Sequence, residues 1–269
     1  MANIQLNIQK NDFLDLAAHQ LNHYASIVDI QSWQEVLNSY LEIKQQVQPK
    51  KVFLVLDDIH QAEYTAMHAI EDDRLYFNIE DECSDVDIND PKFEQWYQNV
   101  GIFNELHHYS QQLQQPIYQQ KIQDLTKKMQ YYSEDDLYAL LRFNQQPLAI
   151  VDTEIQVKIA DIETEALKLA MLPNGYFSCD FDPFENFTII QHIQNYGFEF
   201  IGLGAMLLGW IKTSDFKSDQ IDHLIQDLVM IYPLNISNQN ILKELILENN
   251  YLILPYSESP KEYLDYYSS

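Results

Sequence analysis

Hydrophobic positions spaced three and four residues apart dominate the first part of the chain. One such stripe runs from Phe13 to Tyr24 and a second from Trp33 to Ile43, which predicts helix from Asn11 to Gln48. The polar residues between the stripes offer a turn and a cap, and Pro49 ends the second stripe. We therefore expect residues 1–48 to form an N-terminal helical arm.

The pattern changes after Pro49. Val52 to Leu56 is a short, continuous apolar run rich in β-branched residues, which is typical of a central strand. The remaining segments of this region are predicted as strands at Leu75 to Ile79, Pro147 to Val151 and the alternating Ile155 to Ile159, and as helices from Pro91 to Leu113, Ile117 to Met129, Ser133 to Phe143 and Asp161 to Met171. Residues 49–172 are thus expected to be mixed and helix-dominated.

The stretch from Asn174 to Lys212 contains five of the six glycines in the chain. Its aromatic run from Tyr176 to Phe181 predicts a strand, and Asp182 followed by Pro183 and Glu185 predicts a capped helix. Phe198 to Ile211 is then expected to be a buried strand with bends. Two helices, from Asp219 to Tyr232 and from Asn238 to Asn249, and a last strand from Tyr251 to Leu254 complete residues 173–269.

These patterns together predict an α+β protein. Its helix-rich N-terminal and middle regions would be followed by a C-terminal α/β domain with the order strand, helix, strand, helix, helix, strand. The chain holds 16 Lys and Arg against 41 Asp and Glu, a net charge of −25. Phosphate backbones and anionic membrane surfaces would be repelled by such a charge, so we expect no nucleic-acid or membrane partner and favour a basic protein.

The sequence also bears on location. Its first ten residues lack the charged start and apolar core of a signal peptide, and its longest apolar run is shorter than a bilayer span requires. Cys83 and Cys179 do not suggest a disulfide framework. These features predict a cytoplasmic protein; its oligomeric state stays open.

Acidic residues are concentrated between Glu71 and Asp90, where nine carboxylates accompany a single arginine, Arg74. A block of this kind must be solvated. The 18 tyrosines exceed what core packing needs, and tyrosine anchors protein interfaces efficiently. The predicted partner-binding residues are Asp72, Asp73, Glu80, Asp81, Glu82, Asp85, Asp87, Asp90, Trp96 and Tyr97.

Two segments begin like known metal or cofactor motifs but are incomplete. Asp85-x-Asp87-x-Asn89 begins like a calcium loop but lacks the required glycine and final glutamate, and Gly202-x-Gly204 lacks the third glycine of a dinucleotide fingerprint. We therefore expect no cofactor, no metal and no catalytic residue. The alternative is an enzyme or metal-binding site in the C-terminal domain, formed by Asp180, Asp182, Glu185 and His192.

Residues 174–254 resemble an uncharacterised bacterial domain family usually placed at the C-terminus of its proteins. The matching features are Asn174-Gly175-Tyr176, Asp182-Pro183-Phe184-Glu185-Asn186, Gly202-Leu203-Gly204, Tyr232-Pro233-Leu234 and Tyr251-Leu252-Ile253-Leu254. The cysteine and acid that usually follow the proline are missing here, and the resemblance carries no established reaction.

In general character the whole chain is similar to bacterial immunity proteins, which neutralise secreted toxins. The function predicted from charge, acidic block and tyrosine content is therefore that of a cytoplasmic immunity protein. It would bind a basic toxin or effector domain, including those delivered by type VI secretion, and occlude its active site.

Overall fold

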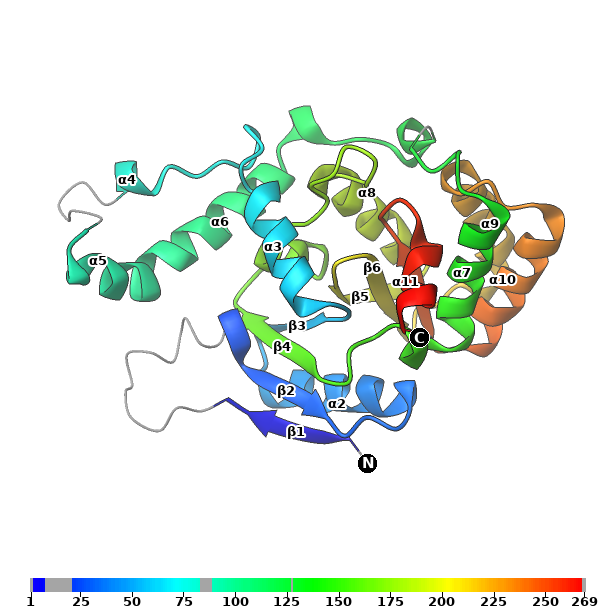
Figure 1. The fold of residues 1–269 in the computed structure, drawn as a ribbon, viewed down its shortest axis with the longest axis horizontal. Helices are drawn as coiled ribbons and strands as arrows, with labels where there is room; N and C mark the ends of the chain where they lie inside the picture. The colour runs from blue at the N-terminus through cyan, green and yellow to red at the C-terminus, as the bar shows by residue number, and fades with distance from the viewer. Residues whose placement is uncertain (1, 8–20, 83–88, 127, 268–269) are drawn as a thin grey trace.

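The fold is built on a seven-stranded mixed sheet, seen in a computed structural model that describes residues 2–7, 21–82, 89–126 and 128–267 (Figure 1). The strands are β1 (Asn3–Leu6), β2 (Ala25–Val28), β3 (Lys51–Val55), β4 (Ile155–Ala160), β5 (Phe198–Leu203), β6 (Leu207–Lys212) and β7 (Tyr251–Pro255). Their order is β1-β2-β4-β3-β5-β6-β7, and only the β3–β5 pair is parallel. Residues 1–48, 49–172 and 173–269 all contribute strands to this one sheet.

Helices cover the sheet and surround its edges. The α-helices are α2 (Trp33–Gln46), α3 (Ile59–Ala69), α4 (Ile79–Glu82), α5 (Pro91–Trp96), α6 (Ile102–Leu113), α7 (Glu134–Gln145), α8 (Pro183–Gln194), α9 (Ile221–Ile231), α10 (Ile236–Glu248) and α11 (Pro260–Tyr267). The shorter elements are the π-helix η1 (Tyr97–Gly101) and the 3-10 helices η2 (Pro116–Tyr118), η3 (Ile122–Leu125), η4 (Pro147–Ala149), η5 (Ala166–Met171) and η6 (Ser218–Gln220).

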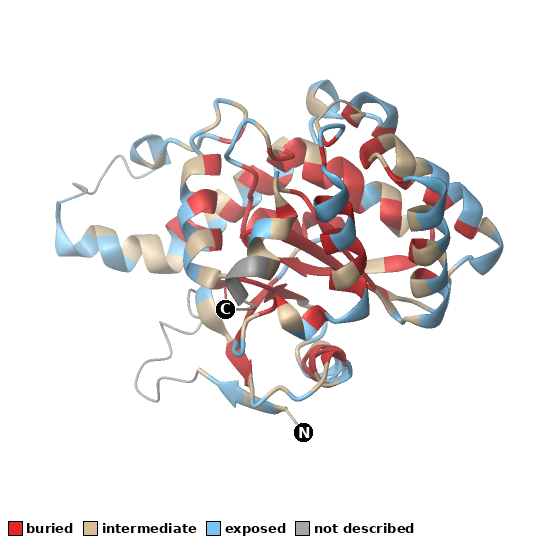
Figure 2. Ribbon diagram, turned by 45° about the vertical axis from the view of Figure 1, so that its right-hand side comes forward, coloured by how far each residue is buried: buried red, intermediate tan, exposed pale blue. Residues whose placement is uncertain are grey.

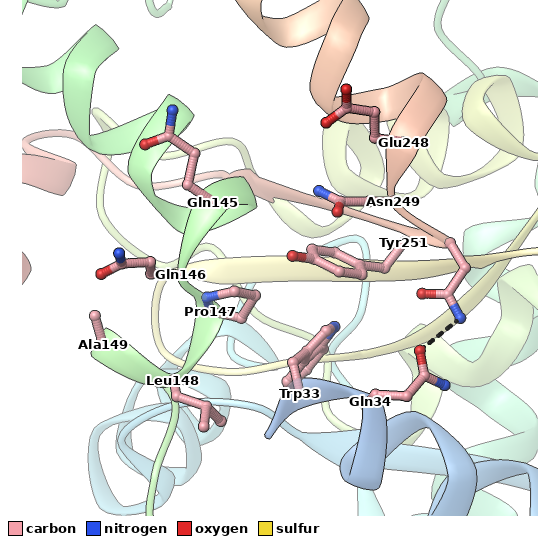
Figure 3. Close-up of a pocket in the computed structure, with 11 residues that line it drawn as sticks. Trp33, Gln34, Gln145, Gln146, Pro147, Leu148, Ala149, Glu248, Asn249 and Tyr251 are labelled. Atoms are coloured by element: carbon pink, nitrogen blue, oxygen red, sulfur yellow. Dashed lines mark hydrogen bonds between the residues drawn. The ribbon is translucent and has the colours of Figure 1, made fainter. Parts of the chain in front are cut away.

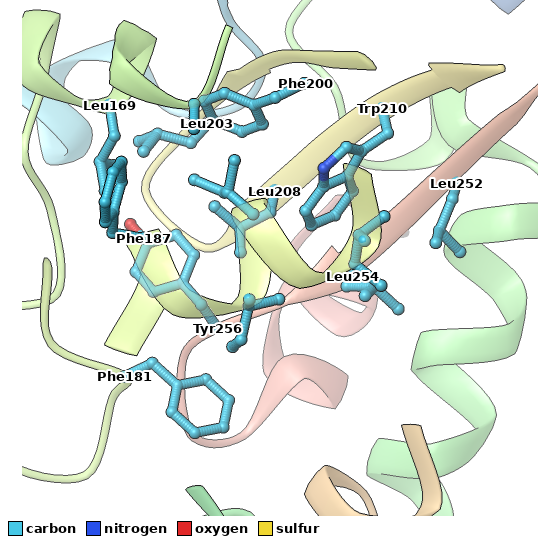
Figure 4. Packing of buried hydrophobic residues seen from close by; sticks show 14 of the residues in the cluster. Leu169, Phe181, Phe187, Phe200, Leu203, Leu208, Trp210, Leu252, Leu254 and Tyr256 are labelled. Carbon is cyan, nitrogen blue, oxygen red and sulfur yellow. The ribbon is translucent and has the colours of Figure 1, made fainter. Parts of the chain in front are cut away.

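Both faces of the central strand are buried, which explains its unbroken apolar run. Phe53 and Val55 of β3 pack into a core shared with α3, α6, α8 and α9, while Val52 and Leu54 pack into a second core shared with α2. Successive side chains of a strand point to opposite faces, so a strand covered on both sides must be apolar throughout. Figure 4 shows the first core around Phe200 and Trp210 of the sheet and Phe187 of α8.

The α+β prediction is confirmed, and so are several of its elements. The predicted central strand is β3, fourth of the seven strands in the sheet. Helix α8 begins as expected, because Asp182 accepts hydrogen bonds from the backbone of Phe184 and Glu185, and Glu185 bonds back to Asp182. The helices predicted near residues 91–113, 133–143, 219–232 and 238–249 and the strands at 155–159 and 251–254 are also present.

Other predicted elements are wrong, and most of the errors concern strands. The helix predicted from Asn11 to Gln48 is interrupted, because Ala25–Val28 forms β2 between β1 and β4; residues 8–20 lie outside the described part. The strands expected at 75–79, 147–151 and 176–181 do not form: they are a turn, the 3-10 helix η4 and an irregular loop. Short apolar runs fit both a strand and a loop folded over a core, and only a neighbouring strand decides between them.

Three further differences are smaller. The helices predicted at 117–129 and 161–171 are replaced by the 3-10 helices η3 and η5 with connecting turns. The single bent strand expected from Phe198 to Ile211 is an antiparallel pair, β5 and β6, so the C-terminal order is α8-β5-β6-α9-α10-β7-α11. The tail after Ser257, for which no core pattern was found, contains α11, which contacts α7.

Candidate functional site

The acidic block predicted to bind a partner forms the connection from α3 through α4 to α5. Figure 1 shows α4 and α5 projecting from the body, and Figure 2 shows that their surface is exposed or intermediate. Asp73, Glu80, Asp81, Glu82 and Asp90 are exposed, and within the described part no ion pair neutralises them. Asp85 and Asp87 lie outside the described residues. The predicted solvated rim is therefore present wherever the chain is described.

Asp72 differs from the other acids because it is engaged internally. Arg74 Nη2 lies 2.6 Å from Asp72 Oδ2 and 2.9 Å from Asp182 Oδ2, and the guanidinium sits 4.3 Å from the centre of the Phe184 ring. Hydrogen bonding to Arg74 lowers the pKa of Asp72. Asp72 thus ties the acidic segment to the start of α8, which limits its availability to a partner.

Trp96 and Tyr97 lie at the junction of α5 and η1, where both are partly buried. The Phe93 ring is tilted against the Trp96 ring, with centroids 5.8 Å apart, and stacked on the Tyr97 ring, with centroids 6.3 Å apart. The Tyr97 hydroxyl donates a hydrogen bond of 2.7 Å to Glu105, and burial raises the pKa of that carboxyl. These rings form an aromatic base for the acidic projection.

A cluster that the sequence did not reveal lies beside the acidic block. The rings of Tyr64 and His68 on α3 are 4.7 Å apart, and His68 is 5.0 Å from Tyr176, which is 5.3 Å from Phe177. Tyr64, Tyr176 and Phe177 are 53%, 48% and 47% exposed. We call these four residues the aromatic cluster. The Tyr64 and His68 spacing of one helical turn is visible in the sequence, but the sequence predicts Tyr176 and Phe177 in a half or fully buried strand.

Acidic groups border the aromatic cluster. A cavity of about 320 Å³ is lined by Tyr176 and His68 together with Glu71 and Asp72. His68 Nδ1 lies 3.7 Å from Glu71 Oε2. Exposed rings next to carboxylates suit a cationic side chain, which the rings attract through their π faces and the carboxylates through charge.

The tyrosine content is a weaker interface signal than the sequence suggests, because several tyrosines are buried in the core. Tyr109, Tyr132 and Tyr256 are at most 7% exposed. Tyr256 donates to the backbone oxygens of Gly204 and Ala205, so its hydroxyl is satisfied inside the core. Tyr131 and Tyr138 are exposed, at 56% and 58%.

The alternative site does not assemble. Glu185 is paired with Lys128 at 2.6 Å and Asp182 with Arg74, while both carboxylates complete the capping box of α8. His192, near the other end of α8, pairs with Asp227 at 2.7 Å. Asp180 accepts from the backbone of Glu258, and burial raises its pKa to about 6. Among the residues that are described, no three His, Cys, Asp or Glu side chains are grouped as a metal ion requires.

Two groups of ionisable residues are buried elsewhere. Lys168, fully buried, lies 2.6 Å from Glu165 and 2.7 Å from both the Tyr40 hydroxyl and the Phe200 carbonyl oxygen. Asp57, at the end of β3, accepts from the backbone of Met206 and Leu207, and burial raises its pKa to about 8. Both groups hold the sheet to the segments packed against it.

The thiol of Cys179 is partly exposed in the loop before α8. Burial raises its pKa to about 11, so it is protonated at neutral pH and a poor nucleophile. The strand expected around Cys179 is absent. Cys83 lies outside the described residues.

Comparison with known proteins adds no assignment. No family model, curated protein or solved structure matches this chain. The resemblance of residues 174–254 to a bacterial domain family therefore stays a prediction. None of the helices in the described ranges combines the length and the apolar character needed to cross a bilayer.

Proposed function

We propose that this protein is a cytoplasmic immunity protein that binds a basic bacterial toxin or effector domain and covers its active site. The observation that carries the proposal is the aromatic cluster, in which Tyr64, Tyr176 and Phe177 are exposed, beside Glu71 and Asp72 at the start of the acidic α3–α5 connection. Aromatic side chains at the centre of a contact supply most of its binding energy, and charges around it speed association.

The two parts of this surface would act at different stages of binding. Carboxylates from Asp73 to Asp90, within a net charge of −25, attract a cationic domain over distances of about 10 Å at moderate salt. The aromatic cluster then packs against the partner, and the cavity between Tyr176 and Glu71 receives a lysine or arginine side chain. Such a contact neutralises a toxin sterically and needs no chemical step.

The first experiment is co-purification with basic toxin domains encoded beside this chain. We expect a stable complex whose association rate falls as salt concentration rises, because exposed charges are screened. Failure of every neighbour-encoded protein to bind would refute the proposal. An association rate independent of salt would refute the electrostatic part.

The second experiment tests the aromatic cluster within that complex. Tyr176→Ala and Phe177→Ala should each raise the dissociation constant at least about 30-fold, equivalent to about 2 kcal/mol, as expected for an interface hot spot. Tyr138→Ala is the matched control, because Tyr138 is 58% exposed on α7, outside the cluster. Equal effects of Tyr176→Ala and Tyr138→Ala would place the interface elsewhere.

The third experiment tests the position of the acids with two triple variants that lose the same number of negative charges. Replacing Glu80, Asp81 and Glu82 by their amides should slow association about tenfold at low salt if they steer the partner. The control replaces Glu154, Glu163 and Glu244, which are also exposed, by glutamine. Equal slowing by both triple variants would show that only total charge matters.

A second function, an enzyme with a carboxylate and histidine site, has less support. Asp182 and Glu185 are occupied by capping and by two cations, and His192 pairs with Asp227. Binding of a partner therefore explains the described geometry better than a reaction at Asp180, Asp182, Glu185 and His192.

A further inference from the structure

A pocket remote from the aromatic cluster opens where three chain segments meet. The start of α2, the end of α7 with η4, and the turn from α10 into β7 line an open surface pocket of about 890 Å³. Figure 3 shows side chains from these segments around it, with the Trp33 indole beneath the Tyr251 ring. The two rings meet edge to face, with centroids 6.0 Å apart and planes at 72°.

The lining of the pocket is polar and almost uncharged. Eleven described residues line it, and five are carboxamides: Gln34, Gln145, Gln146, Asn249 and Asn250. Glu248 is the only charged residue among them, and none is lysine or arginine. An anionic ligand would therefore meet a negative group and no cation, which excludes nucleotides and sugar phosphates as ligands.

One buried polar group of the pocket lacks a partner. Trp33 is 5% exposed, and its indole Nε1 has no hydrogen-bond acceptor in the described part of the chain. In Figure 3 this nitrogen lies on the side of the indole that faces Tyr251. The indole nitrogen of Trp210 also lacks a partner, but that residue is fully buried in the core and does not line this pocket. This buried N–H faces the Tyr251 ring, which the indole meets edge to face, so its environment depends on the position of that ring at the pocket wall.

Some carboxamides of the pocket are hydrogen-bonded within the protein, and others are free to bind a ligand. Asn250 donates to Gln34 at 3.2 Å, and Asn249 donates to the Asn144 carbonyl oxygen at 2.8 Å, so these amides are held in place. Gln145 and Gln146 are exposed and make no side-chain hydrogen bond with other described residues. Each offers both a donor and an acceptor to a bound molecule.

We propose that this pocket binds an uncharged saccharide. Neighbouring sugar hydroxyls donate and accept at once, as carboxamides do, and the C–H face of a sugar ring suits the apolar surface of Tyr251, Pro147 and Leu148. A peptide added as a strand is disfavoured, because the free edge of β7 is closed by Asn144, whose amide pairs with both backbone groups of Ile253.

The test uses the indole N–H signals of the three tryptophans in a ¹H–¹⁵N spectrum of the full chain. N,N′-diacetylchitobiose and cellobiose are the probes, and Trp33→Phe assigns the Trp33 signal. We expect at least one disaccharide to shift that signal saturably, with a dissociation constant of about 1 mM or below. A blocked trialanine peptide and glucose 6-phosphate serve as the peptide and anion comparators and should leave it unmoved.

Variants locate the binding. Gln145→Ala with Gln146→Ala should weaken the sugar at least about tenfold, because two amide contacts are lost. Gln191→Ala with Gln226→Ala is the matched control, since both glutamines are exposed on other helices. The proposal is overturned if neither disaccharide moves the Trp33 signal, if only the peptide or the anion does, or if both double variants behave alike. It is independent of the toxin-binding proposal, so each can fail alone.

Discussion

The carboxamide of Asn144 pairs with both backbone groups of Ile253. Its Nδ2 donates to the Ile253 carbonyl oxygen at 2.7 Å, and its Oδ1 accepts from the Ile253 N–H at 2.9 Å. Asn144 lies on α7 and is 1% exposed. A side chain thus takes the place of a neighbouring strand at the edge of β7, which protects the sheet from pairing with another chain.

Asn144→Leu should lower the free energy of unfolding by about 2–4 kcal/mol, because it leaves a buried N–H and a buried carbonyl oxygen unsatisfied. Urea denaturation measures the change. Asn240→Leu on α10, an exposed position, should stay within about 0.5 kcal/mol of the parent protein. Similar losses in both variants would show that the Asn144 contacts contribute nothing specific.

Lys168→Met should also destabilise the protein strongly. The ammonium of Lys168 neutralises Glu165 at 2.6 Å and Glu199 at 3.6 Å, and breaking such a buried pair from one side costs about 3–5 kcal/mol. Chemical denaturation of Lys168→Met, Glu165→Gln and the double variant tests this coupling. If the losses of the single variants simply add, the two side chains do not interact energetically.

Asp57 should make stability depend on pH. Burial raises its pKa from 3.8 to about 8 in the folded protein, so between these values the folded state holds a proton that the unfolded chain has released. The stability due to this group is therefore present at low pH and falls as pH rises toward 8, by up to about 1.4 kcal/mol per pH unit.

Asp57→Asn removes that titration. The unfolding free energy of the parent protein minus that of the variant should decrease from about pH 5 to pH 8, whatever the offset between the two proteins. Urea denaturation across this range supplies both values. A difference that stays constant or increases with pH would contradict a raised pKa at Asp57.

Gly202→Ala should unfold or severely weaken the sheet. Gly202 pairs with Leu54 at the parallel β3–β5 contact, and a Cβ there would lie 1.9 Å from the Leu54 carbonyl oxygen. We expect a loss of about 3 kcal/mol or more, measured as a reduced melting temperature and yield of folded protein. Gly209→Ala should cost less, because its Cβ would meet side chains and no backbone: Leu56 Cδ1 at 2.7 Å and Ile201 Cγ1 at 3.4 Å.

Local sequence patterns were sufficient to predict an element that carries a cap or an unbroken apolar run. Helix α8 could be predicted because Asp182 and Glu185 form a capping box within four residues of sequence. The β3 strand could be predicted because burial on both faces leaves a continuous apolar run. The short strand β2 could not, since its four residues directly follow the helical stripe ending at Tyr24 and only pairing with β1 and β4 makes them a strand.

The candidate site also has one part that the sequence predicts and another that it does not. The acidic block was evident from residue types alone, but the aromatic cluster joins Tyr64 and His68 to Tyr176 and Phe177, more than 100 positions later in the chain. The burial of Tyr256 and the closing of the β7 edge by Asn144 likewise depend on segments distant in sequence.

By itself the sequence determined the α+β class, the net charge of −25 and the position of the acidic block, because composition and local periodicity carry that information. Only the tertiary structure decided which acids are neutralised, which tyrosines are exposed, and where an amide-lined pocket opens. Each of these depends on contacts between segments far apart in the chain, and no local pattern specifies such contacts.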